Sequence, residues 1–243
     1  MDLYSSFKDG SLARKLADHL RSLAPPPATF MEVCGTHTVA IARHGIRQLM
    51  PEGIRLTSGP GCPVCVTSTA DIDRFIAATR IPDVIVTTFG DLLRVPGSRS
   101  TLKQEMAAGA DVRVVYSPLD ALDLARENPG RQVVFLGVGF ETTAPTIGAA
   151  ILQAAREKLQ NFTVISSHKV MPPALEALAG DPAIRLDGLI CPGHVSIIIG
   201  AAAYRPLAEK YRMPCVITGF EPVDIMQGII MLAKQRMENR PTV

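Results

Sequence analysis

The chain has 243 residues, of which 47% are hydrophobic and 20% are charged, and its net charge is +2. This length supplies apolar side chains for one large domain or two smaller ones, and the near-neutral charge gives no electrostatic basis for nucleic-acid binding. The amino-terminal residues are polar, unlike a signal peptide, and the apolar runs are too short or too interrupted to span a bilayer. We therefore expect a cytoplasmic protein that binds neither nucleic acid nor membrane.

The first predicted element is a helix over residues 12–24, because leucines recur there at helical spacing. Ser11 is its predicted N-cap, and three consecutive prolines end it. His19 is expected on the helix surface. Residues 1–30 therefore form an amino-terminal helical segment.

Short apolar runs then alternate with helical patterns along the rest of the chain. The predicted strands are residues 29–33, 54–57, 84–88, 112–116, 133–138, 163–167, 186–190 and 216–218. The predicted helices are residues 38–50, 68–79, 100–108, 118–127, 143–159, 172–179, 203–211 and 222–238. Short apolar strands that alternate with helices are typical of parallel sheets covered on both faces.

This pattern predicts an α/β fold of two Rossmann-like units, each a mostly parallel sheet of about four strands, with a cleft between them. We place the seam at Asn128-Pro129-Gly130, a turn-forming sequence before the fifth strand. The predicted boundaries are 31–130 for the first α/β domain and 131–218 for the second. Residues 219–243 would form a carboxyl-terminal helix.

A cluster of cysteines lies in the first third of the chain. Cys62 and Cys65 form a CxxC motif in a loop rich in glycine and proline, before the predicted helix at 68–79. In a reducing cytoplasm such spacing favours redox or metal chemistry over a structural disulfide, and we expect the pair to close into a disulfide in air. The alternatives are two inert buried thiols, or a zinc site that also uses Cys34 and His37 or His44.

Cys34 ends the strand predicted at 29–33, and the helix that follows would point its amino end at the sulfur. It is therefore a candidate nucleophile or single metal ligand. His37 would lie in the first turn of the same helix and reach the same site, although a helix cap or a hydrogen-bonded core histidine is the alternative. His44 is expected on the solvent side.

Polar side chains follow several other strands at the edge where an open α/β sheet binds ligands. These candidates are Asp91, Glu141, His168, His194 and Glu221. The alternative is turn chemistry, with each acid serving as a charge at a helix amino end. Cys191 and Cys215 flank or end apolar strands and are read as core thiols.

With these residues in hand, the chain resembles the HypD family of NiFe-hydrogenase maturation factors. The resemblance covers about residues 30–230. Its motifs, in chain order, are Cys34-Gly35-Thr36-His37-Thr38, Gly59-Pro60-Gly61-Cys62-Pro63-Val64-Cys65, Thr88-Phe89-Gly90-Asp91, residues 139–145, Pro192-Gly193-His194-Val195-Ser196 and residues 219–224.

The resemblance implies a scaffold for assembling the Fe(CN)2CO moiety, more than a conventional turnover enzyme. Cys34 would be the iron ligand with His37 nearby, and Cys62 and Cys65 the redox-active pair. The implied partners are a small HypC-type protein, whose cysteine shares the iron, and HypE, which donates cyanide with HypF. The remaining candidates, Asp91, Glu141, His168, His194 and Glu221, would line the cleft.

One feature departs from the family. Its members usually continue into a cysteine-rich domain that holds a four-iron four-sulfur cluster, whereas this chain ends at Val243 and lacks those cysteines. The cluster, expected for the family, is therefore not carried over. Two other functions stay open: a stand-alone thiol–disulfide oxidoreductase that uses Cys62 and Cys65, and a zinc-stabilised module.

Overall fold

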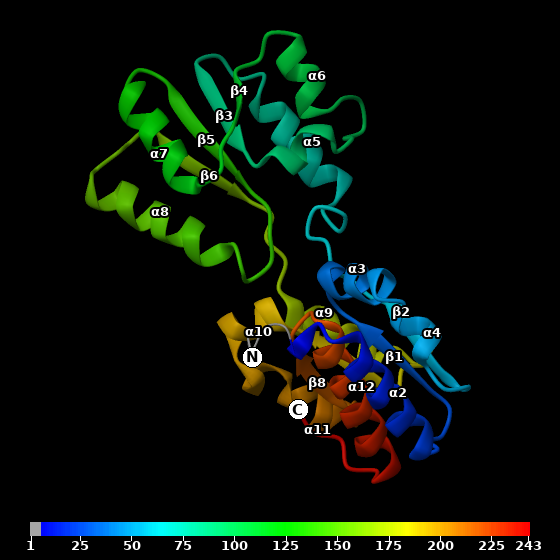
Figure 1. Ribbon diagram of the computed structural model, residues 1–243. Coiled ribbons are helices and arrows are strands. Elements are labelled where there is room, and N and C mark those ends of the chain that lie inside the picture. The colour runs from blue at the N-terminus through cyan, green and yellow to red at the C-terminus, as the bar shows by residue number, and fades with distance from the viewer. Residues whose placement is uncertain (1–5) are drawn as a thin grey trace. The chain divides into compact units, whose positions relative to one another are not determined.

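The computed structural model describes residues 6–243 and shows an α/β protein (Figure 1). Its strands form two four-stranded parallel sheets with helices around them. The chain divides into two compact units. The first combines the residues up to Cys62 with Val170–Val243, and the second is Pro63–Lys169.

The sheet of the first unit has the strand order β2-β1-β7-β8. Its strands are β1 (Ala28–Glu32), β2 (Ile54–Ser58), β7 (Gly188–Pro192) and β8 (Cys215–Thr218). Its described helices are α2 (Gly10–Ser22), α3 (Gly35–Arg43), α4 (Ile46–Leu49), α9 (Met171–Gly180), α10 (Gly193–Ile199), η2 (Ala201–Tyr204), α11 (Arg205–Tyr211) and α12 (Pro222–Met237).

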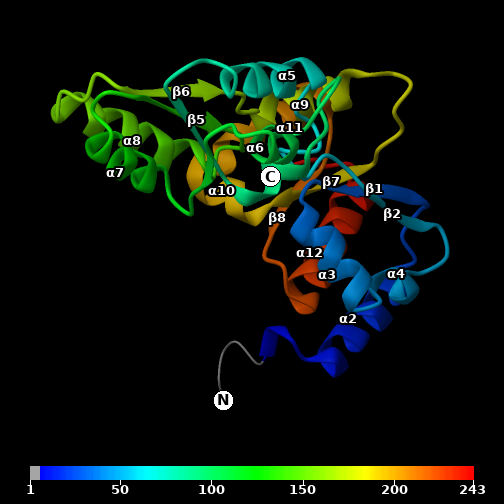
Figure 2. The same ribbon diagram turned by 90° about the horizontal axis from the view of Figure 1, so that it is seen from above.

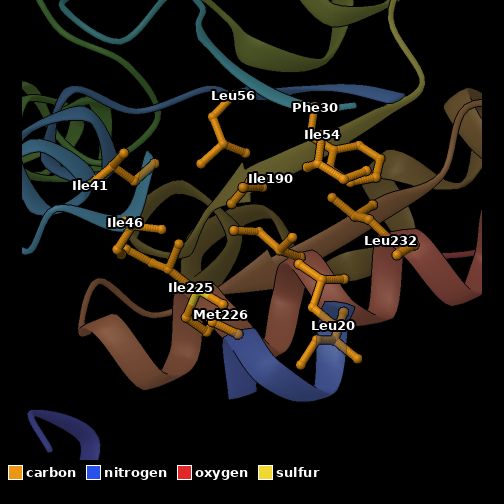
Figure 3. Packing of buried hydrophobic residues seen from close by; sticks show 14 of the residues in the cluster. Leu20, Phe30, Ile41, Ile46, Ile54, Leu56, Ile190, Ile225, Met226 and Leu232 are labelled. Carbon is orange, nitrogen blue, oxygen red and sulfur yellow. The ribbon is translucent and has the colours of Figure 1, made fainter. Parts of the chain in front are cut away.

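One face of this sheet packs on α2, α3, α4 and α12 to form an apolar core (Figure 3). Successive side chains of a strand point to opposite faces, and the burial of β1 alternates accordingly. Ala28 and Phe30 enter the core, and Glu32, two residues further along the same row, is also buried. The alternation of β1 therefore buries the Glu32 carboxylate at the end of a row of apolar side chains.

The sheet of the second unit has the order β4-β3-β5-β6. Its strands are β3 (Val84–Thr88), β4 (Val112–Val114), β5 (Gln132–Gly137) and β6 (Phe162–Ser166). Its described helices are α5 (Thr69–Ala78), η1 (Gly90–Arg94), α6 (Leu102–Ala107), α7 (Pro118–Glu127) and α8 (Ala144–Arg156).

Both faces of this second sheet are buried, as the unbroken burial of β3 indicates. Val86 and Val134 pack with α5 and α6 on one face, whereas Ile85 and Val133 pack with α7 and α8 on the other. Helices α7 and α8 contact each other and lie side by side in both views (Figures 1 and 2). The short apolar strands read from the sequence therefore lie in a three-layer unit.

All eight predicted strands are confirmed within a few residues, and so is the prediction of two four-stranded parallel units. Three local details differ. Asp9, and not Ser11, caps α2, since its Oδ1 accepts from the backbone N–H groups of Ser11 and Leu12. The helix predicted over 38–50 is broken at Gly45, whose φ of 62° is left-handed. The sequence reading also missed α10.

The predicted seam at Asn128-Pro129-Gly130 was wrong. Those residues join α7 to β5 inside the second unit, so the boundaries 31–130 and 131–218 do not match the two sheets. Strands β7 and β8 return instead to pair beside β1. Within residues 6–243, no helix is long and apolar enough to cross a membrane.

Candidate functional site

Four chain segments leave the first sheet at one edge, because all four strands run parallel. Cys34 follows β1, the loop with Cys62 follows β2, His194 follows β7 and Glu221 follows β8. This carboxyl edge is where open α/β sheets bind ligands. The first unit therefore gathers the segments that carry five of the predicted site residues, His37 of α3 included.

Cys34 occupies the N-cap position of α3 in extended conformation, with φ −159° and ψ 131°. Its side chain makes no capping hydrogen bond, and its thiol is free and half-buried. The amino end of a helix carries partial positive charge and favours an anion. The predicted position of Cys34, between a strand and the start of a helix, is confirmed.

The loop that carries Cys62 touches the turn that carries Cys34. A Cβ placed on Gly61 would lie 2.3 Å from the backbone N of Gly35 and 2.8 Å from the carbonyl carbon of Cys34. Only glycine permits this approach of two backbones. Gly61 thereby places Cys62, the next residue, close to the Cys34 turn.

Cys62 and Cys65 are both disulfide-bonded, and since the other three cysteines are free thiols, the two are bonded to each other. The structure thus has the CxxC pair as a disulfide, and its closure in air stays a prediction. The pair stands some residues before α5, whose N-cap Ser68 accepts from the backbone N–H of Asp71. The amino end of α5 is thus capped by its own side chain, and not by a thiolate.

His37 is fully buried beneath the same edge. Its Nε2 lies 2.8 Å from the carbonyl oxygen of Gly219 and 2.8 Å from Thr218 Oγ1. Because a carbonyl oxygen only accepts, Nε2 must carry the proton. Burial lowers the pKa of His37 below 6.5, which favours the neutral ring.

In that neutral tautomer Nδ1 of His37 has an unshared electron pair. This atom is buried and has no hydrogen-bond partner. A buried nitrogen acceptor without a partner is uncommon, and it is the ring atom that binds a proton or a metal when the other nitrogen is a donor. The hydrogen bonds of Nε2 thus orient the His37 ring, and Nδ1 is the basic nitrogen without a partner.

Phe220 lies between two histidines of this edge. Its ring centroid is 4.6 Å from that of His37 and 4.3 Å from that of His194. His194 is exposed and His37 is buried, so the stack runs from the surface into the unit. Glu221, the next residue, is half-buried, with Lys8 3.7 Å away.

The sequence analysis missed Glu32, whose side chain contacts Ser58, before the Cys62 loop, and Thr38, in the helix that follows Cys34. Its side chain is fully buried, and its Oε1 accepts from Ser58 Oγ at 2.7 Å and from an Arg47 guanidinium nitrogen at 3.0 Å. The signal was present in the alternation of β1, where an acid occupies the inward row. It also missed Thr218 and Phe220, whose contacts with His37 link positions more than 180 residues apart.

The second unit positions the other candidates at the ends of its own strands. Asp91 is exposed in the first turn of η1, and Glu141 is half-buried after β5. His168 follows β6 and shares a 2.8 Å hydrogen bond with Ser166 through Nδ1. Its Nε2 is buried without a partner, and burial lowers its pKa.

The predicted core thiols are confirmed, since Cys191 and Cys215 are both fully buried. A hydrogen bond with Cys215, together with burial, raises the pKa of Cys191. With these two in the core and two more in a disulfide, the chain does not offer the four thiolates of a four-iron four-sulfur cluster. Across residues 6–243, no three histidine, cysteine or acidic side chains are grouped for metal binding.

A cavity of about 500 Å³ lies at the opposite, amino-terminal edge of the first sheet. Its lining includes Thr29, Arg55, Arg185 and Asp187. The Asp187 carboxylate already has partners there, since it accepts a hydrogen bond from the Thr29 amide and forms a salt bridge with Arg236. The cavity contains none of the predicted site residues.

Similarity to known proteins shows which family the chain belongs to. The family model HypD, described as the hydrogenase formation hypA family, matches residues 11–243. The chain belongs to the HypD family. It is 49% identical over 250 residues to hydrogenase maturation factor HypD of Rhodobacter capsulatus, and 47% identical over 224 residues to that of Escherichia coli K12.

The match to the Rhodobacter HypD protein includes the whole chain but only 66% of that protein's length. The match to the E. coli HypD protein covers 92% of the chain and 60% of that protein. HypD2 of Bradyrhizobium diazoefficiens is 45% identical over 252 residues, again across 66% of its length. The chain thus spans slightly less than two thirds of these HypD relatives.

Proposed function

We propose that this protein acts in hydrogenase maturation, as a scaffold on which an iron ion receives cyanide and carbon monoxide. Iron is the cargo of this scaffold, and Cys34 is its ligand from this chain. The observation that carries the proposal is the free Cys34 thiol at the amino end of α3. The first turn of the same helix holds the buried His37, whose Nδ1 has no hydrogen-bond partner. The membership in the HypD family supports it.

The chemistry of the residues fits this cargo. A thiolate is a soft donor that suits iron with cyanide and carbonyl ligands, and it gains from the partial positive charge at the amino end of α3. His37 is held by Gly219 and Thr218 with Nδ1 free of partners. We assign it the task of accepting a proton or a hydrogen bond beside the iron.

Cys62 and Cys65 form the redox pair of the proposed scaffold. Two thiols that close into a disulfide release two electrons and two protons, and a reducing partner protein returns them. The contact of Gly61 with the Cys34 turn supports an exchange of electrons with the iron at Cys34. In this proposal His194 and Glu221 complete the polar surroundings within the first unit, whereas Asp91, Glu141 and His168 stay predicted site residues of the second unit.

The proposal includes partners. A single thiolate from this chain leaves most iron positions for other donors, so we propose a HypC-type protein that adds a second cysteine. HypE, charged by HypF, would deliver cyanide. The complex would assemble in the cytoplasm.

Iron retention tests this proposal. The chain is purified anaerobically with its HypC-type partner, and iron per complex is measured for the wild type, Cys34→Ala and Cys215→Ala. We expect Cys34→Ala to lose the iron and Cys215→Ala, which alters a core thiol of the same sheet, to keep it. Full iron in the Cys34→Ala complex would refute the assignment.

A second candidate function is a stand-alone thiol–disulfide oxidoreductase. It is favoured by one observation, the disulfide between Cys62 and the exposed Cys65. Such an enzyme turns over a generic disulfide substrate without a partner, and this turnover stops in Cys65→Ser. The absence of turnover in the wild-type chain would eliminate this candidate.

The zinc alternative requires Cys62 and Cys65 as thiolates, whereas the structure has both in a disulfide. It predicts stoichiometric zinc in aerobically purified protein and unfolding by chelators. Metal analysis together with circular dichroism separates it from the iron scaffold.

A further inference from the structure

We infer that Glu32 is a positioning residue that holds the Cys34 turn against the segment leading to Cys62. This inference deepens the proposed function, because it assigns the buried carboxylate that fixes the distance between the iron ligand and the redox pair. It rests on contacts within the first unit, from three different elements that meet at the end of β1.

The side chain of Glu32 connects two cysteine segments directly. Ser58, the last residue of β2, donates to Oε1 at 2.7 Å. Thr38 of α3 has its Oγ1 3.4 Å from the same Oε1 and 3.4 Å from the carbonyl oxygen of Cys34. One carboxylate oxygen thus faces both the strand before the CxxC loop and the helix that Cys34 caps.

Arg47 makes a charged carboxylate tolerable in this position. Its guanidinium donates to Glu32 Oε1 at 3.0 Å and to Ser58 Oγ at 3.1 Å. A buried charge is costly unless it is paired and hydrogen-bonded, and hydrogen bonds to charged groups are the stronger ones. Arg47 therefore joins the network from α4 as a third element.

The backbone of Glu32 adds a further link to the same loop. Its carbonyl oxygen accepts from the Gly59 amide at 2.8 Å. A Cβ on Gly59 would lie 2.6 Å from the Met31 sulfur, and a Cβ on Gly61 would lie 2.3 Å from the Gly35 nitrogen and 2.8 Å from the Cys34 carbonyl carbon. The side chain and main chain of Glu32 thus hold Ser58 and Gly59, the first two residues of the segment that leads to Cys62.

A purely structural role does not explain the carboxylate. Ala28 and Phe30 fill the same row of β1 with apolar side chains, and replacing a buried ion pair by apolar groups is often neutral or stabilising. Moreover, Glu32 Oε2 is buried without a hydrogen-bond partner, a cost that a core built for stability alone avoids. The contacts instead fix the geometry of the two cysteine segments.

A crosslinking rate tests the inference without iron. In a reduced Cys65→Ser background, dibromobimane joins Cys34 to Cys62 and fluoresces strongly only when both arms have reacted, and mass spectrometry confirms the linked peptides. We expect Glu32→Ala to slow this crosslink roughly ten-fold, because positioning of two groups controls such rates. Glu32→Gln, which keeps an acceptor oxygen, should recover most of the rate.

Two further variants keep the test decisive. Ser58→Ala removes one hydrogen bond from an exposed side chain, so it replaces Glu32→Ala if that variant does not fold. Asp187→Asn is the matched control, since Asp187 ties Thr29 and Arg236 at the opposite edge of the same sheet. It should leave the rate unchanged.

The outcomes separate this inference from the proposed function. An unchanged rate in Glu32→Ala and Ser58→Ala, an equal loss in Asp187→Asn, or no crosslink with Glu32 in place would each overturn the positioning role. A slowed crosslink together with full iron retention in Cys34→Ala would uphold the role of Glu32 and refute the iron scaffold.

Discussion

At the residue scale, Cys34 and His37 illustrate how far local sequence leads. Both could be predicted because they lie within four positions of each other after one strand, where a helix begins. The burial of Glu32 could also have been predicted, since the alternation of β1 places its side chain inward. The roles of Thr218 and Phe220 could not be predicted, because their contacts with His37 depend on β1 and β8 joining one sheet through β7.

The lowered pKa of His37 predicts how stability depends on pH. Burial keeps the folded-state pKa below 6.5, so the unfolded chain binds the proton first and stability falls as pH drops below about 6.5. His37→Gln should flatten this fall between pH 7.5 and 5.5 in urea unfolding, and His44→Gln, at an exposed position, should not. An unchanged slope in His37→Gln would mean that the buried ring is not the titrating group.

At the element scale, strands were more predictable than the helices and turns between them. Runs such as Val84–Thr88 are short, apolar and β-branched, and these features are local. Residues 193–199 carry a similar apolar run yet form α10, a helix that the sequence did not predict. Gly45 split a predicted helix because its left-handed backbone ends α3.

The Gly61 contact gives an element-scale prediction. Gly61→Ala would place a methyl group 2.3 Å from the Gly35 nitrogen, so the CxxC loop must move away from the Cys34 turn. We expect iron retention with the partner protein to fall at least several-fold while the fold persists, because small displacements at a site cost much. Gly130→Ala is the control, since nothing lies within 4 Å of its Cβ position. Wild-type retention in Gly61→Ala would show that the close approach is dispensable.

At the scale of the whole molecule, the fold class was predictable and the partition of strands was not. Alternation of strands and helices indicates parallel sheets regardless of which strands pair. The assignment of β7 and β8 to the first sheet depends on contacts between residues far apart in sequence, such as Phe30 with Gly188. The turn at Asn128-Pro129-Gly130 carries no information about that pairing.

The charge pattern predicts that acid destabilises the second unit more. Its carboxylates with lowered pKa values are Asp71, Asp73, Glu105, Asp111 and Glu157. The pKa of Glu105 falls to about 2 through hydrogen bonds from Arg80 and Ser100. Such groups stabilise the fold above their unfolded pKa, and this stability is lost as pH falls through the folded pKa.

Hydrogen exchange between pH 5 and 2.5 measures this difference. Peptides from β3 and α5 should lose protection more steeply than peptides from β1 and α12, and Glu105→Gln should reduce the difference. Each pair is solvent-screened, so we expect the single substitution to have a small effect. Equal loss of protection in both units would contradict the prediction.

In the proposed function, Cys34 binds the iron that receives cyanide and carbon monoxide. Its most direct test is the infrared spectrum of the complex purified anaerobically with the HypC-type partner, for the wild type, Cys34→Ser and Cys215→Ala. We expect cyanide and carbonyl bands in the wild type and in Cys215→Ala, and their loss in Cys34→Ser. Bands of full strength in Cys34→Ser would contradict it.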